Sequence, residues 1–270
     1  MFTDPALKKE IIEKKRFIER EKAENLNFSL EQMFNEHLET EALDHSLRIE
    51  YHIPIELRDK NKSVRKAFEK EIRTAGKNLK NAWDYGKNHF NPLFDDFFLV
   101  DVAKLVDPKV EGYRADNVRV LTSMISRPDP YSLREEHLPK FFQDLKELNS
   151  KHEQNKQEKI YESCFDIGAW VHFNLARIHP FEDGNGRIAR ILHNLYLRNS
   201  DSFPPIILYE GERFDYYSHL ENAMRGFIQR KGRKNSLVVT RDGLSKGEME
   251  FYDFMAGKLN MALDKIIEKT

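Results

Sequence analysis

The pattern of hydrophobic positions predicts a mainly helical chain. Apolar residues recur every three or four positions from Ile160 to Ile178, and a second stripe of the same spacing runs from Ile188 to Leu195. Each stripe would form one buried face of a helix. The polar residues between the two stripes are therefore expected to form a loop that connects two buried helices.

Helical spacing continues toward both ends of the chain. Ser29 and Gln32 have the spacing of a capping box, and a helix follows over residues 30–50. Further stripes cover residues 63–83, 138–148 and 251–266. The first two dozen residues alternate Lys and Glu around isoleucines, which favours a helix with a solvated face. The last stripe has two candidate partners, the core of the chain and a second subunit.

Two segments break the helical pattern. Val118 and Val120 alternate with Arg119 after the turn-prone pair Asp116 and Asn117, so a short hairpin is predicted near residues 112–123. The stretch KHEQNKQEK, which begins at Lys151, is predicted to be an exposed loop.

Charge and composition exclude some partners. The 270 residues include 44 Lys and Arg against 45 Asp and Glu, so no global field favours nucleic acid or a membrane surface. Cys164 is the only cysteine, which excludes an intrachain disulfide and suits a thiol in the core. The chain shows neither a secretory signal nor a run of membrane-spanning length, so the expected location is the cytoplasm.

The loop HPFEDGNGRIAR, from His179 to Arg190, carries the candidate chemistry. The dipeptides Asp183-Gly184 and Asn185-Gly186 are typical of turns that join two strands. Here apolar helical stripes flank them, so a turn with no further role is disfavoured. The first N–H groups of a helix attract anions, and nearby glycines let the main chain approach one. Arg187 and Arg190 project from one side of the same helix. These features predict a phosphate cradle.

Two further residues of the loop suit phosphate chemistry. Asp183 is an oxygen ligand for the Mg²⁺ that a polyphosphate needs. His179 is a candidate general base, and Phe181 is expected to anchor the loop in the core. A metal cluster of His172, His179 and His193 is a less favoured alternative, because no cysteine or repeated carboxylate completes it.

At these residues the sequence resembles the Fic family, whose signature is His-Pro-Phe-x-Asp/Glu-Gly-Asn-Gly-Arg-x-x-Arg, and it matches every fixed position. The resemblance implies a mainly α fold, a Fic-type helical bundle with a short β-hairpin flap. It also implies three regions: an N-terminal helical region (1–89) with an inhibitory helix at about 30–50, a catalytic core (90–230) and a C-terminal helical extension (231–270).

The resemblance further implies a protein adenylyltransferase, which moves AMP from ATP to a Tyr, Thr or Ser hydroxyl. His179 would be the catalytic base and Asp183 the Mg²⁺ ligand. The nucleotide would be bound by Gly184, Asn185, Gly186, Arg187, Arg190, Tyr216 and Tyr217. The flap residues Val118, Val120 and Thr122 would dock the target segment by strand-like pairing.

Many Fic proteins carry a self-inhibitory Ser/Thr-x-x-x-Glu motif followed by Gly or Asn. Ser46 and Glu50 match it, while Tyr51 departs from it. A carboxylate on Arg190 would occupy the partner of the γ-phosphate. The alternative is that Ser46 and Glu50 belong to ordinary helix surface.

Other functions stay open at this point. Met224 stands where relatives often have asparagine, which leaves another nucleotide donor as an alternative. Removal of AMP is a second alternative, and a non-catalytic nucleotide sensor is a third. The expected partners are ATP, a protein with an exposed hydroxyl and a second copy of the chain, with no nucleic acid and no membrane.

Overall fold

A computed structural model describes residues 2–25, 28–51, 62–120, 123–157, 164–201, 203–231 and 240–269. The longer helices are α1 (Pro5–Asn25), α2 (Phe28–Glu50), α4 (Lys62–His89), α5 (Asp96–Val106), α7 (Leu138–Gln157), α8 (Cys164–Ile178), α9 (Asn185–Asp201), α10 (Arg213–Lys231) and α11 (Lys246–Ile267). Short turns of helix complete the order: α6 (Pro130–Ser132), η1 (Leu133–His137), η2 (Glu210–Glu212) and η3 (Arg241–Gly243). These residues contain helices and no strand, in agreement with the predicted mainly helical class.

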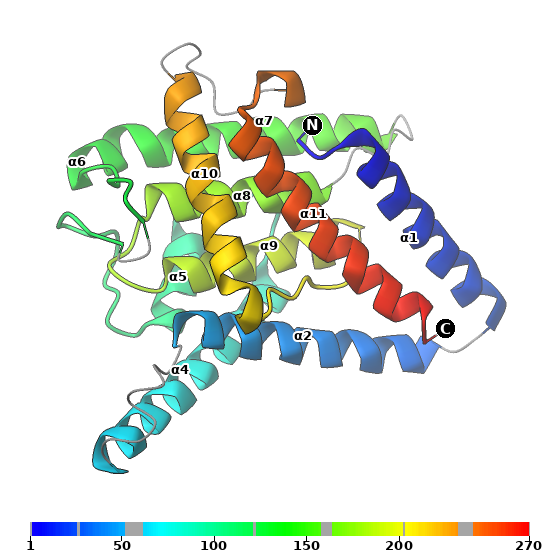
Figure 1. The fold of residues 1–270 in the computed structure, drawn as a ribbon, viewed down its shortest axis with the longest axis horizontal. Coiled ribbons are helices and arrows are strands. Elements are labelled where there is room, and N and C mark those ends of the chain that lie inside the picture. Colours follow the sequence, from blue (N-terminus) through cyan, green and yellow to red (C-terminus); the bar gives the residue numbers. More distant parts are fainter. Residues whose placement is uncertain are drawn as a thin grey trace.

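Helices α8 and α9 pack against each other in the middle of the molecule (Figure 1). Gly168 makes their close approach feasible, since a Cβ at this position would lie 2.9 Å from the His193 ring. Trp170 of α8 stacks on Phe141 of α7, with ring centroids 5.3 Å apart. The two predicted apolar stripes thus form the core that holds the loop between α8 and α9.

The two ends of the chain pack on each other. Helix α1 runs beside α11, and α11 also packs on α10 and α8 (Figure 1). The helix has the predicted solvated face, and Ile11 and Ile18 are buried on the opposite face. Phe2 stacks on Tyr252 with ring centroids 4.7 Å apart. The C-terminal stripe therefore packs on the core of its own chain.

Two predicted segments differ from the structure. Residues 151–157 continue α7 instead of forming a loop. The predicted hairpin is not formed within 112–120 and 123–127, the described parts of that region, where side chains instead of a strand ladder hold the main chain. Thr122 and the side chain of Cys164 lie outside the described residues.

No helix in the described part of the chain is long and apolar enough to cross a membrane.

Candidate functional site

The loop begins with an unusual backbone conformation at His179. Helix α8 ends at Ile178, the His179 N–H still donates to Leu175 O at 2.9 Å, and His179 has φ 51°. A left-handed conformation costs an L-residue about 1–2 kcal/mol. The following Pro180 normally restricts its predecessor to extended conformations, which adds to the strain. Strain at a residue in a pocket is typical of functional sites.

Asn185 and Phe181 fasten the loop. The Phe181 N–H donates to Asn185 Oδ1 at 3.0 Å, and Asn185 Nδ2 donates back to Phe181 O at 2.8 Å. Phe181 is fully buried and stacks on Tyr113 with ring centroids 5.4 Å apart, as expected of an anchor. The side chain of Asn185 is thus engaged within the loop, and only its main chain at the start of α9 is left to meet a ligand.

The N-terminus of α9 forms a cradle that a glycine keeps open. Gly184 has φ 80°, a conformation that favours glycine. A Cβ at Gly186 would lie 2.4 Å from Glu50 Oε1 and 3.1 Å from Arg190 Nη1. A carboxylate from α2 therefore occupies the space beside this helix N-terminus, where the helix dipole favours negative charge.

Arg190 is buried and pairs with the end of α2. Its Nε donates to Ser46 Oγ at 2.7 Å, and its Nη2 donates to Ser46 O at 3.1 Å and to Glu50 Oε1 at 2.7 Å. Burial alone would lower the pKa of Arg190, but the Glu50 carboxylate raises it above its usual range. Nη1 has no hydrogen-bond partner among the described residues and faces Gly186. The arginine thus keeps one donor free toward the cradle.

Arg187 has a different partner. Its Nη2 donates to Asp183 Oδ2 at 2.8 Å, one helical turn earlier in the chain. The Asp183 side chain is 65% exposed, whereas that of Arg187 is 4% exposed. The guanidinium also lies 5.6 Å from the ring centre of Tyr51, the residue that departs from the inhibitory motif. The buried Arg187 Nε has no partner among the described residues.

His179 is held in its neutral form at physiological pH. Burial lowers the pKa of its imidazole to about 4, and the positive charges of Arg127 and Arg114 act in the same direction. Its Nδ1 has no hydrogen-bond partner among the described residues. His179 is partly exposed to the pocket, so its neutral imidazole can accept a proton from a hydroxyl group there.

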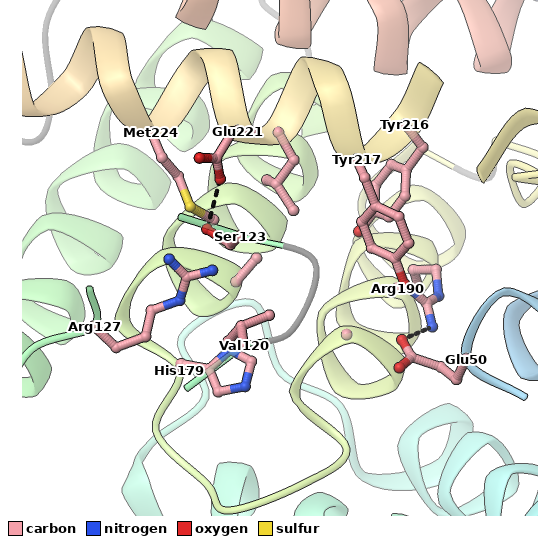
Figure 2. A pocket seen from close by; sticks show the side chains of 13 residues that line it. Glu50, Val120, Ser123, Arg127, His179, Arg190, Tyr216, Tyr217, Glu221 and Met224 are labelled. Carbon is pink, nitrogen blue, oxygen red and sulfur yellow. Dashed lines mark hydrogen bonds and ion pairs between the residues drawn. The ribbon is translucent and has the colours of Figure 1, made fainter. Parts of the chain in front are cut away.

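Four residues of the site, Glu50, His179, Gly186 and Arg190, line one pocket of about 540 Å³, a volume that includes its open mouth. Figure 2 shows Arg127 and His179 on one side and the Glu50 and Arg190 pair on the other. The remaining predicted residues of the lining are Tyr216, Tyr217 and Val120. The predicted residues Asp183, Gly184, Asn185, Arg187, Ser46 and Val118 are not part of this described lining.

The two tyrosines of α10 differ in exposure. Tyr216 is buried, and its hydroxyl lies 2.7 Å from His172 Nε2. Its ring centre is 6.0 Å from the Arg190 guanidinium, so it supports the arginine from within the core. Burial raises the pKa of Tyr217, and this ring is only partly buried. Of the pair, Tyr217 has the more accessible ring.

Sequence reasoning did not assign three polar residues of the pocket to the site: Ser123, Arg127 and Glu221. Ser123 Oγ donates to Glu221 Oε2 at 2.5 Å (Figure 2), and the Met124 N–H donates to Glu221 Oε1 at 3.3 Å. The position of Glu221, four residues after Tyr217 on a helix, is the signal that would have found it. Arg127 had no such signal, because an irregular segment places it.

The alternative histidine cluster is not formed. His172 and His193 are buried with ring centroids 5.7 Å apart, and burial lowers the pKa of His193 to about 3. No group of three His, Cys, Asp or Glu side chains suited to a metal ion exists in the part of the chain that the structure describes. Both histidines therefore belong to the core.

Residues 96–197, which include the whole loop, match the sequence profile of the Fic/DOC family. The chain is 38% identical over 97 residues to the protein adenylyltransferase Fic of Nematostella vectensis, a match covering 35% of this chain and 22% of that relative. Against protein adenylyltransferase fic-1 of Caenorhabditis elegans the identity is 28% over 159 residues, which cover 57% of this chain and 29% of the relative. The matches thus span less than a third of these relatives.

Solved structures show the same fold. A Fic domain containing signaling protein from Bacteroides thetaiotaomicron superimposes with a TM-score of 0.63 at 20% identity, covering 96% of this chain and 95% of that one. A Fic family protein from Desulfovibrio desulfuricans gives a TM-score of 0.62 at 20% identity, with coverage of 100% and 76%. The protein therefore has a helical Fic-like fold, in which residues 96–197 are similar to the Fic/DOC family domain.

Proposed function

We propose that this chain transfers AMP from ATP to a Tyr, Thr or Ser hydroxyl of a protein, with Glu50 as a restraint. The observation that carries the proposal is that His179, Gly186 and Arg190 face one pocket. A proton acceptor, an anion cradle and a buried cation are the parts that phosphoryl chemistry requires. The names of the sequence relatives support adenylyl as the transferred group.

In the proposed reaction His179 takes the proton of the target hydroxyl. The hydroxyl oxygen forms a bond to the α-phosphorus, and the bond from that phosphorus to the pyrophosphate oxygen breaks. The depressed pKa of His179 suits this role, because the imidazole is neutral before the reaction. Its left-handed backbone places the ring at the start of the cradle.

The main chain at Gly184, Asn185 and Gly186 would receive the phosphates. Arg187 would balance the charge of the pyrophosphate, and Arg190 would hold the γ-phosphate. The buried donors Arg187 Nε and Arg190 Nη1, unpartnered among the described residues, are groups that phosphate oxygens would satisfy. A Cβ at Gly186 would fill this space, which explains a glycine there.

Asp183 fits a Mg²⁺ ion bound with the nucleotide. Its carboxylate is exposed and stands beside the cradle, while phosphate oxygens and water would supply the other ligands. When bound, the ion would neutralise phosphate charge. Arg187, now paired with Asp183, would turn to the phosphates.

We further propose that Glu50 restrains the reaction by holding Arg190. The carboxylate occupies the space beside Gly186 and the arginine together, so the γ-phosphate has to displace it. In the same proposal, Tyr217 and Met224 face the base of the nucleotide, with Tyr216 supporting Arg190. Val118, Val120 and Thr122 dock the target chain in this proposal.

Substitution of His179 tests the assignment. We expect His179→Ala to abolish transfer of the α-phosphate label from ATP, a loss of at least about 1000-fold, since no other neutral base faces the described pocket. ATP affinity, measured by calorimetry, should stay within about twofold of the unsubstituted chain. Equal loss of binding and transfer would contradict the role of His179 as the base.

Removal of AMP is the second candidate, because the Glu50 carboxylate faces the same pocket as His179 and would orient a water molecule. The two functions respond oppositely to Glu50→Gly. Transfer should rise in this variant, whereas release of AMP from a modified protein should fall.

A further inference from the structure

Arg114 is a buried arginine that contacts the main chain of the candidate base. Its side chain is 1% exposed, yet no carboxylate of the described residues forms a salt bridge with it. Instead its three guanidinium nitrogens each donate to a main-chain carbonyl. Nε donates to His179 O at 2.8 Å, Nη1 to Asp116 O at 2.9 Å, and Nη2 to Pro128 O.

These contacts surround the strained part of the loop. Arg114 Nε binds the carbonyl of His179, and the Arg114 main-chain N–H donates to Pro180 O at 3.0 Å. The two carbonyls on either side of Pro180 are thus held by one residue. A strained conformation persists only where its surroundings hold it, and His179 has φ 51° directly before a proline.

The other two contacts hold residues 116–120 and 123–128, the described parts of a segment that lines the pocket. Asp116 and Pro128 stand near the two ends of this segment, which supplies Val120, Ser123 and Arg127 to the lining. One guanidinium therefore sets the position of both ends relative to His179. The planar fork of arginine suits three carbonyls in fixed directions, which a lysine ammonium cannot match.

We propose that Arg114 is a positioning residue for His179, which fixes the histidine peptide and both ends of segment 116–128 in the geometry that transfer requires. The inference rests on the proposed role of His179 as the base. A residue that served stability alone would affect folding and nucleotide binding together. A positioning residue instead affects the chemical step while nucleotide binding persists.

The test compares Arg114→Lys and Arg114→Gln in the Glu50→Gly background. The lysine variant keeps the charge and loses the fork, while the glutamine variant keeps an amide donor and loses the charge. Arg134→Lys is the matched control, since exposed Arg134 donates to the carbonyls of Tyr113 and Arg114 without touching His179. Circular dichroism verifies that each variant is folded.

We expect changes in two measured quantities, the transfer rate and the NMR resonance of His179. The transfer rate at saturating ATP should fall by about tenfold to 100-fold in both Arg114 variants, with KM for ATP within about twofold, because small displacements of a reacting group are costly. In histidine-labelled protein, the NMR resonance of His179, assigned by its loss in His179→Ala, should shift in both. Arg134→Lys should change neither readout.

The NMR arm separates this inference from the proposed function. If Glu50→Gly shows no transfer, the proposed function fails while the His179 resonance still tests Arg114. An unchanged resonance in Arg114→Lys would overturn the inference. So would an unchanged transfer rate, a loss of ATP binding that parallels the loss of transfer, or failure of both variants to fold.

Discussion

Two arginines three residues apart on α9 have opposite kinds of partner. Arg187 pairs with Asp183, one helical turn away in the loop, and that carboxylate is 65% exposed. Arg190 pairs with Glu50, 140 residues away on α2, and its own side chain is 6% exposed. The Arg187 and Asp183 pair forms between residues four positions apart in the sequence. The Arg190 and Glu50 pair forms only when the end of α2 packs beside α9.

The comparison teaches that the two pairs respond to different events. An exposed carboxylate exchanges partners at small cost, so a metal-bound nucleotide can take Asp183 from Arg187. Arg190 is buried, and it also makes two contacts to Ser46 on the same helix as Glu50, so we expect α2 to control the release of this pair. In the proposed function, the local pair takes part in binding of the nucleotide, and the distant pair takes part in control.

Among changes to the two pairs, the largest effect is expected when the local pair is broken. Asp183→Asn in the Glu50→Gly background should lower the transfer rate by about 100-fold, because the proposed metal ligand is lost while Arg187 remains. Single-turnover transfer of an α-phosphate label measures this. Glu182→Gln is the matched control, since Glu182 is the neighbouring exposed carboxylate. Equal rates for Asp183→Asn and its parent would contradict the assignment.

A smaller effect loosens the distant pair. Ser46→Ala removes the acceptor of Arg190 Nε and leaves Glu50 in place, so transfer should rise by roughly threefold to tenfold, which corresponds to a net hydrogen-bond contribution of about 1 kcal/mol. Thr40→Ala on the same helix is the control, because its hydroxyl contacts only Glu36 O among the described residues. A rate no higher than that of the control would show that Ser46 does not support the restraint.

The smallest expected effect is that of mild acid. An ordinary histidine would lose activity as the pH falls through about 6.5, but the pKa of His179 is lowered to about 4. The imidazole stays neutral above that value, so transfer by Glu50→Gly should be nearly constant from pH 8 to 5 and fall only below. Initial rates with circular dichroism at each pH measure this. A midpoint near 6.5 in folded protein would contradict the burial of His179.

The same comparison shows what the sequence could predict. Apolar stripes predicted α8 and α9, and the loop between them follows from its position, so the local pair lay within reach of sequence reasoning. The contact of Glu50 with Arg190 was predicted only from the resemblance to a family. The spacing of apolar residues does not indicate which residues 140 positions apart are in contact. The structure brings those two side chains together.

Segment 112–128 shows why the rest escaped prediction. Alternation at Val118 and Val120 suggested a hairpin, but a strand ladder requires a partner that the pattern cannot supply. In the described residues, Arg114 and Glu221 hold the segment by side-chain contacts to its main chain. Such contacts produce no regular spacing of residues in the sequence. For the same reason Arg127 was not predicted to line the pocket.

The central claim is that Glu50 restrains a transferase by holding Arg190. The most direct measurement is intact-protein mass spectrometry of the unsubstituted chain, Glu50→Gly and Glu50→Gly/His179→Ala after incubation with Mg²⁺ and ATP. Asp44→Asn, on the same helix and paired only with exposed Arg48 among the described residues, is the control. We predict an AMP adduct that forms about 10- to 100-fold faster in Glu50→Gly than in the unsubstituted chain or the control, and none without His179. Equal rates with and without Glu50, or an adduct that persists without His179, would contradict the account.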